Sequence, residues 1–173
     1  VIALGAGAVV AADGAPVFAD GATPLSSGLN ADGQLGNGTT TNRTAAGATS
    51  LGATMVQIAS GREHAYSLDD TGRIWAWGDN SRGAVGDGTS ADRPTPVRLS
   101  LTDVAEVEAG HYHGIARRND GTVWTWGYGA LGQLGLGTTT NRTSPAQVPG
   151  ITDAVAVAAG RDMSYVVRAD GTM

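Results

Sequence analysis

The chain has 173 residues, among them 27 glycines, no cysteine and no lysine, and its formal net charge is −5 at pH 7. The absence of cysteine excludes a disulfide framework, a thiol nucleophile and a thiolate metal site, and the absence of lysine excludes a phosphate-binding P-loop. An acidic chain with thinly spread arginines lacks the basic face typical of nucleic-acid binding. The abundance of Gly, Thr and Val predicts short strands and turns in place of helices.

Residues 1–20 differ in composition from the rest of the chain. They begin with the apolar run V-I-A-L-G-A-G-A-V-V-A-A, which is too short to cross a bilayer. This run predicts the remnant of a secretory signal peptide, with P-V-F-A before Asp20 as the cleavage site. The alternative is a degenerate strand of the repeating unit described below, with V-F-A-D-G in place of a Trp-bearing strand. We expect no membrane span.

From residue 21 onward a Gly-rich stretch of 17 residues recurs, at 28–44, 78–94 and 127–143. The third copy contains G-Y-G-A-L-G, which matches the G-x-G-x-x-G fingerprint of a dinucleotide-binding turn. However, Asn30 and Asn80 stand where Gly129 does. The Gly- and Thr-rich residues that follow also disfavour the helix that a dinucleotide site needs. The glycines therefore indicate a structural loop, and we expect no cofactor.

Each repeat of 49 or 50 residues has one order of parts. An alternating apolar run such as V-Q-I-A-S-G is followed by a second run, a tight turn such as N-D-G-T, and a run with two tryptophans, I-W-A-W-G or V-W-T-W-G. Period-two patterns separated by Gly-rich turns predict short antiparallel strands, and a fixed period of this length is typical of repeat architectures. The units span about 21–54, 55–103 and 104–152, with a partial unit at 153–173.

The combined pattern, A-G-x-x-H, then D-G-x-V-W-x-W-G, then G-Q-L-G, G-T-T-T and N-R, resembles the repeat of the RCC1-like (regulator of chromosome condensation) β-propellers. The resemblance covers about residues 25–173. It implies an all-β fold, a seven-bladed propeller in which each blade is a four-stranded antiparallel sheet. The chain holds about three to three and a half blades, so we expect either a fragment of a longer chain or a half-ring completed by a second copy. Open blade faces would favour self-association.

The repeated side chains have a structural interpretation. The tryptophans of each pair stand two residues apart and share one strand face, which predicts packing anchors between blades; they are Trp75, Trp77, Trp124 and Trp126. His64 and His113 recur at one position, where Met163 stands in the next unit, so we expect a histidine hydrogen-bonded inside each blade and no metal site. Repeated guanidinium groups are expected to hold loop carbonyls between blades; they belong to Arg43, Arg93 and Arg142.

Repeat proteins keep a framework constant and vary one loop face, which is where partners commonly bind. The variable positions of this chain follow the first run and the Trp-bearing run of each unit. Tyr and Arg are enriched among the anchors of interfaces. The candidate partner-binding residues are Arg62, His111, Tyr112, Tyr128 and Arg161. The sequence shows no catalytic, cofactor-binding or metal-ligating constellation.

These observations predict a non-catalytic propeller that binds an unidentified protein partner, with no nucleic acid and no cofactor. We expect a bacterial protein that is secreted or at the cell surface; a cytoplasmic location is the alternative. The resemblance offers a second function, a guanine nucleotide exchange factor or chromatin-associated regulator. For exchange factors of the family it would imply a wedge-like insertion, which units of constant length do not contain.

Overall fold

The computed structural model describes residues 9–10, 16–17 and 23–173 of the chain. All the regular secondary structure in this part of the chain is β-strand, which confirms the all-β prediction. β1 (Val9–Val10) and β2 (Pro16–Val17) pair with each other as an antiparallel ladder. The signal-peptide interpretation of residues 1–20 falls largely outside the described residues and stays a prediction.

Two complete four-stranded antiparallel sheets form the middle of the chain. The first contains β5 (Met55–Ser60), β6 (His64–Asp69), β7 (Ile74–Gly78) and β8 (Arg93–Arg98). The second contains β9 (Val104–Ala109), β10 (His113–Arg118), β11 (Val123–Gly127) and β12 (Arg142–Gln147). Both sheets meander in chain order because their central strands are joined by tight turns, in which Gly72 and Gly121 adopt φ of 74° and 78°.

A two-stranded sheet lies on each side of this pair, and each corresponds to half a blade. The two sheets are β3 (Leu25–Gly28) with β4 (Arg43–Ala48), and β13 (Ala154–Ala159) with β14 (Ser164–Arg168). Gly28 pairs with Arg43 as Gly78 pairs with Arg93, so β3 is the third strand of its blade. The alternative that residues 17–21 stand in for the Trp-bearing strand falls largely outside the described residues and stays a prediction. β13 and β14 pair as β9 and β10 do one unit earlier, so they are the first two strands of their blade.

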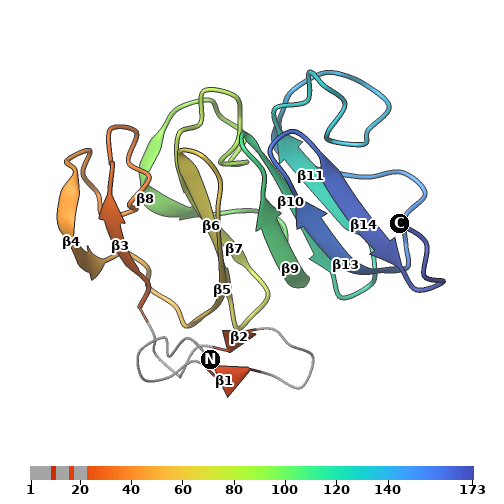
Figure 1. Cartoon of the computed structure of the whole chain (residues 1–173), viewed down its shortest axis with the longest axis horizontal. Coiled ribbons are helices and arrows are strands. Elements are labelled where there is room, and N and C mark those ends of the chain that lie inside the picture. Colours follow the sequence, from red (N-terminus) through yellow and green to blue (C-terminus); the bar gives the residue numbers. More distant parts are fainter. Residues whose placement is uncertain (1–8, 11–15, 18–22) are drawn as a thin grey trace.

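The sheets stand side by side in chain order, from β3 and β4 in orange to β13 and β14 in blue (Figure 1). β9 packs against β5 and β6, and β13 packs against β9 and β10. From the first complete blade onward, each sheet thus buries a face against the next one, which is how propeller blades are stabilised. The predicted propeller architecture is confirmed as an arc of two complete blades with half a blade on either side.

The second tryptophan of each pair inserts into the Gly-rich loop of the preceding unit. Trp77 donates its indole N–H to the carbonyl of Gln34, and Trp126 donates to that of Ala84, each at 2.9 Å. A Cβ added to Gly36 would lie 2.9 Å from Trp77, and one added to Gly86 would lie 2.6 Å from Trp126. The loop glycines are therefore required because an indole fills the space of their missing side chains.

The first tryptophan of each pair makes different contacts. Trp75 donates to Asp69 Oδ2 at 3.0 Å, within its own hairpin. Trp124 donates to Thr122 Oγ1 at 3.2 Å and also packs against the apolar cluster shared by the two complete blades. Trp77, Trp124 and Trp126 thus pack between blades. The hydrogen bond of Trp75 stays within its own hairpin.

Side chains on the first strands also connect neighbouring blades. Gln57 in β5 donates to the carbonyl of Val107 at 2.8 Å and accepts from its N–H at 3.1 Å. One unit later, Glu106 accepts a hydrogen bond from the N–H of Val157 at 3.2 Å. These bonds satisfy backbone groups of the next blade, so they fix the position of one first strand relative to the next.

A buried asparagine organises two of the three Gly-rich loops. Asn80 accepts from the N–H of Val85 at 3.0 Å and donates to the carbonyls of Thr89 and Ala91, each at 3.1 Å. Asn30 makes the equivalent bonds in the first loop. In the first two copies an asparagine stands where the dinucleotide fingerprint has its second glycine. The same asparagine, Asn30 or Asn80, holds its loop together through these hydrogen bonds.

We predict that Asn80→Ala lowers the free energy of unfolding by at least ~2 kcal/mol, because each buried polar group left without a partner costs about 1–3 kcal/mol. Urea denaturation followed by circular dichroism measures the change. Asn119→Ala is the matched control, since Asn119 is exposed and its side chain bonds to Asp103, beside the ends of β9 and β10. Equal midpoints for the two variants would contradict the role given to Asn80.

Candidate functional site

Three variable positions come together where the first strands of consecutive units end. Arg62, His111 and Arg161 each follow the glycine at the end of β5, β9 or β13. The N–H of Arg62 bonds to the carbonyl of His111 at 3.3 Å, and the N–H of His111 bonds to that of Arg161 at 2.9 Å. The three residues line one shallow depression of about 370 Å³. The repeat thus places them in a row along one end of the blades.

An aromatic and cationic stack adjoins this row. The rings of Tyr112 and Tyr128 are 6.4 Å apart and edge to face, and the ring of His111 lies 4.5 Å from that of Tyr112. The guanidinium carbon of Arg82 is 4.0 Å from the centre of the Tyr112 ring and 4.7 Å from that of Tyr128. We call Arg62, Arg82, His111, Tyr112 and Tyr128 the rim cluster.

Contacts inside the rim cluster restrict its side chains. Arg62 donates to the hydroxyl of Tyr112, and its guanidinium carbon lies 5.7 Å from that ring. A cation over an aromatic ring contributes about 0.5–1 kcal/mol at an exposed site, so Arg82 with its two rings is held more firmly than a lone surface arginine. The arrangement therefore presents flat rings and guanidinium groups in a fixed geometry.

The structure brings together four of the five candidate partner-binding residues, namely Arg62, His111, Tyr112 and Tyr128. Arg161 lines the depression beside His111, but its side chain is 76% exposed and pairs with Asp162 at 3.1 Å, outside the stack. Sequence reasoning missed Arg82. The sequence shows that Arg82 stands at a variable position of a Gly-rich loop. The sequence of one unit does not show that its side chain reaches the rings of Tyr112 and Tyr128 in the next unit.

The two repeated histidines are buried but not equally bonded. His113 Nε2 lies 3.0 Å from Ser164 Oγ of the next unit, whereas neither ring nitrogen of His64 has a partner among the described residues. The prediction of a hydrogen-bonded histidine inside each blade is therefore wrong for His64. The cause lies in the neighbouring blade, where Gly114 holds the place that Ser164 holds one unit later and offers no hydroxyl.

Two of the three repeated arginines bind within their own units. Arg43 donates to the carbonyl of Ala48 at 3.1 Å, and Arg93 pairs with Asp87 Oδ2 at 2.6 Å. Arg142 is exposed at the start of β12. The prediction that these guanidinium groups hold carbonyls between blades is therefore wrong for two of them: Arg93 binds a carboxylate of its own loop, and Arg43 binds a carbonyl of its own strand. For Arg142 it stays a prediction.

The described ranges, 9–10, 16–17 and 23–173, contain no group of three or more His, Asp or Glu side chains placed to hold a metal ion. They also contain no helix of the length and apolar character needed to cross a membrane. The rim cluster itself presents aromatic rings, guanidinium donors and one imidazole.

The fold and its repeat define a protein built from propeller blades. The model for the regulator of chromosome condensation (RCC1) repeat matches residues 71–117 and 120–167, which is more than half of the chain. A second model of the same description matches residues 55–84 and 104–133. The chain belongs to the RCC1 repeat family, as the resemblance in its sequence indicates.

Two solved structures show the same fold. The crystal structure of Prp20p from Saccharomyces cerevisiae, whose report concerns binding to Gsp1p and histones, is 22% identical with a TM-score of 0.78 and covers 88% of this chain. Yeast RCC1 (Prp20) bound to Kap60 is 23% identical with a TM-score of 0.67 and covers 79% of it. The chain spans 40% and 33% of the length of these two structures.

We predict that stability falls as pH is lowered from about 6.5 to about 4. Burial lowers the pKa of His64 from 6.5 to about 4 and also lowers the pKa of His113. Well above pH 6.5 both histidines are neutral in folded and unfolded chains. As the pH falls through 6.5, the unfolded chain takes up protons that the folded chain excludes. A shift of this size in one histidine corresponds to ~3 kcal/mol across the window.

Urea midpoints measured from pH 7.5 to pH 4 test this prediction. His64→Gln removes one titrating group and should flatten the dependence on pH. His111→Gln is the control and should keep the wild-type slope, because His64 and His113 remain. A slope that is the same in all three proteins would show that His64 is not responsible.

Proposed function

We propose that the chain is a non-catalytic protein-interaction module that binds its partner through the rim cluster. The observation that supports this proposal is the convergence of five variable residues from two consecutive blades into one stack. Tyr and Arg are the side chains that most often dominate binding energy at interfaces. The RCC1 repeat propeller is a fold consistent with protein–protein interaction.

The rim cluster is specific to one junction between units. Arg82 occupies the fifth position of its Gly-rich loop, and Asp32 and Leu131 occupy that position in the other two loops. Tyr128 likewise corresponds to Asp79 one unit earlier. A cation over an aromatic ring is therefore not a by-product of the repeat, because the equivalent positions of the preceding junction carry two carboxylates. Side chains that differ between units, on a framework that the units share, support a binding role for these positions.

A second candidate function is guanine nucleotide exchange on a small GTPase, or association with chromatin. It is favoured by the similarity to Prp20p, whose report names Gsp1p and histones as binding proteins. Purified Gsp1p and histones are direct probes for this chain. Acceleration of fluorescent nucleotide release from a small GTPase would support exchange, whereas binding without acceleration would support the non-catalytic role.

Export to the cell surface or the medium is a further proposal, supported only by the apolar run at residues 1–20. Fusing residues 1–20 to a reporter enzyme that is active only outside the cytoplasm tests it. Reporter activity in a bacterial host supports export, and an inactive reporter retained in the cytoplasm contradicts it.

We predict that a photo-crosslinking residue at Tyr128 captures a protein partner from the native host, and that the same residue at Asp70 does not. Asp70 is exposed in the β6–β7 turn, at the opposite end of the strands from the rim cluster. Once that partner is purified, Tyr112→Ala should weaken binding at least tenfold, or about 1.4 kcal/mol.

Asp70→Ala is the matched control and should bind like the wild-type protein. Isothermal titration calorimetry measures the affinities, and circular dichroism verifies that both variants are folded. An unchanged affinity for folded Tyr112→Ala and Tyr128→Ala variants would rule out the rim cluster as the binding surface.

A further inference from the structure

The side chain of Arg82 is held against two rings, and no described residue pairs with its charge. The guanidinium carbon lies 4.0 Å from the centre of the Tyr112 ring and 4.7 Å from that of Tyr128. The three residues are half-buried. Within residues 23–173, no carboxylate forms an ion pair with Arg82, and no acceptor takes a hydrogen bond from its guanidinium. The planar group therefore presents free N–H donors in a fixed orientation.

The other two arginines along the blade ends already have carboxylate partners. Arg62 Nε lies 3.4 Å from Glu63 Oε1, and Arg161 Nε lies 3.1 Å from Asp162 Oδ2. Arg82 therefore contributes one uncompensated positive charge where two blades meet. One charge on a planar fork of donors matches a carboxylate, which accepts two parallel hydrogen bonds from a guanidinium. A phosphate dianion would add a second negative charge to a rim that already carries Glu63 and Asp162.

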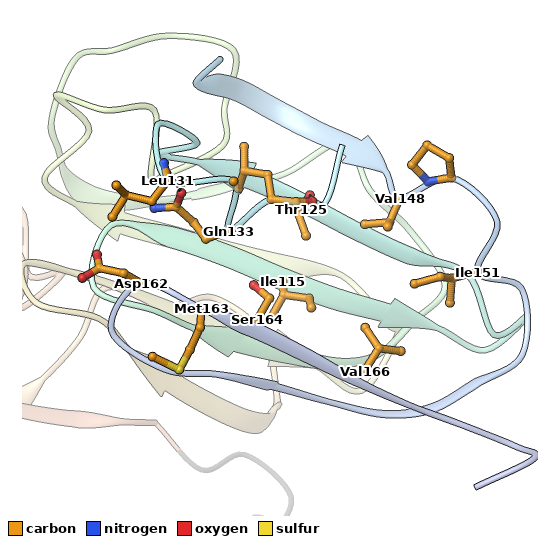
Figure 2. Close-up of a pocket in the computed structure, with 14 residues that line it drawn as sticks. Ile115, Thr125, Leu131, Gln133, Val148, Ile151, Asp162, Met163, Ser164 and Val166 are labelled. Carbon is orange, nitrogen blue, oxygen red and sulfur yellow. Dashed lines mark hydrogen bonds between the residues drawn. The ribbon is translucent and has the colours of Figure 1, made fainter. Parts of the chain in front are cut away.

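The neighbouring junctions between units carry negative charge at the equivalent positions. At the preceding junction, three carboxylates stand where this one has Arg82 and its two rings, and they belong to Asp32, Glu63 and Asp79. At the following junction, Leu131 takes the place of the arginine and Asp162 that of the first ring, and both lie at one end of a pocket (Figure 2). Carboxylates on both sides repel an anion, so they direct it to the single junction with the unpaired guanidinium.

We propose that the rim cluster recognises one carboxylate side chain, of Glu or Asp, in a partner segment that has no further acidic residue beside it. The carboxylate accepts hydrogen bonds from the edge of the Arg82 guanidinium, while the rings of Tyr112 and Tyr128 keep their contacts with that group. The depression of about 370 Å³ beside His111, lined in part by Gly and Ala, accommodates the backbone of the segment. This inference rests on the proposed function, because it names the chemistry of the partner that the rim cluster binds.

A peptide with a single glutamate and blocked ends, acetyl-Gly-Gly-Glu-Gly-Gly-amide, is the first probe, since its side chain is its only carboxylate. NMR signals of the backbone amides and the arginine Nε–H groups are followed while the peptide is added to the whole 173-residue chain. We expect the signals of Arg82 and Tyr128 to shift and to saturate, with a Kd of roughly 1–10 mM. The same peptide with glutamine in place of glutamate should leave both signals unshifted.

The chain itself supplies substitutions that its Gly-rich loops accept. Arg82→Leu and Arg82→Asp introduce the residues that the third and first loops have at this position, and both should remove the shift of the Tyr128 amide. Arg82→Lys keeps the charge but loses the planar fork, so it should weaken binding less. Arg98→Leu is the matched control, because Arg98 is exposed and pairs with Trp75 near the β6–β7 turn, at the opposite end of the strands. Circular dichroism verifies that all variants are folded.

The proposal is overturned if the Arg82 signal does not move up to ~30 mM peptide, if the glutamine peptide gives the same shift, or if Arg98→Leu loses binding as Arg82→Leu does. A phosphoserine peptide or one with three adjacent glutamates that binds at least tenfold more tightly would contradict the choice of a single carboxylate.

The crosslinked partner separates this inference from the proposed function. Arg82→Leu and Arg82→Asp should each weaken its binding at least tenfold. If Tyr112→Ala weakens partner binding but folded Arg82→Leu does not, the carboxylate is wrong and the rim cluster remains the binding surface. If Tyr112→Ala and Tyr128→Ala leave partner binding unchanged while the glutamate peptide still shifts the Arg82 signal, the proposed function fails and the carboxylate site stands.

Discussion

The insertion of one indole into the Gly-rich loop of the preceding unit is the interaction on which the rest of the structure depends. A tryptophan buries roughly 150–250 Å² of surface and needs a partner for its N–H; the carbonyl of Ala84 supplies that partner for Trp126. The loop receives the ring only because Gly86 lacks a side chain. The tryptophan and the glycine thus contact each other across two units. A single blade cannot bury either of them, because the ring and the loop belong to different units.

The parts of the fold that repeat were predictable because each is encoded within one unit. Alternating runs, a tight turn and paired tryptophans predict three strands of each blade, and the resemblance to the family repeat implied the fourth. Contacts between units were less predictable. The bonding of His64 depends on Gly114 in the next blade, and that of His113 on Ser164. Neither outcome follows from the repeat pattern, because the position opposite each histidine varies.

The residues of the candidate site were also predictable only in part. Four of its residues were found because they are Tyr, Arg or His at positions where the units differ, a signal present in the sequence itself. Arg82 was missed because its role consists of reaching the rings of Tyr112 and Tyr128 in the following unit. A single unit contains the arginine without its rings, so only the packing of two blades reveals the stack.

The geometry of the rim cluster follows from the indole contact beside it. Arg82 lies two residues before Ala84, and Tyr128 lies two residues after Trp126, so the bond between the indole and the carbonyl fixes the separation of the arginine from the ring. The framework therefore sets where these two side chains meet, and their identities set what they recognise. Asp32 and Asp79 occupy the same two positions at the preceding junction and provide carboxylates in place of a cation and a ring. Substitution at these positions changes the chemistry of the rim without touching the indole and glycine that hold the blades together.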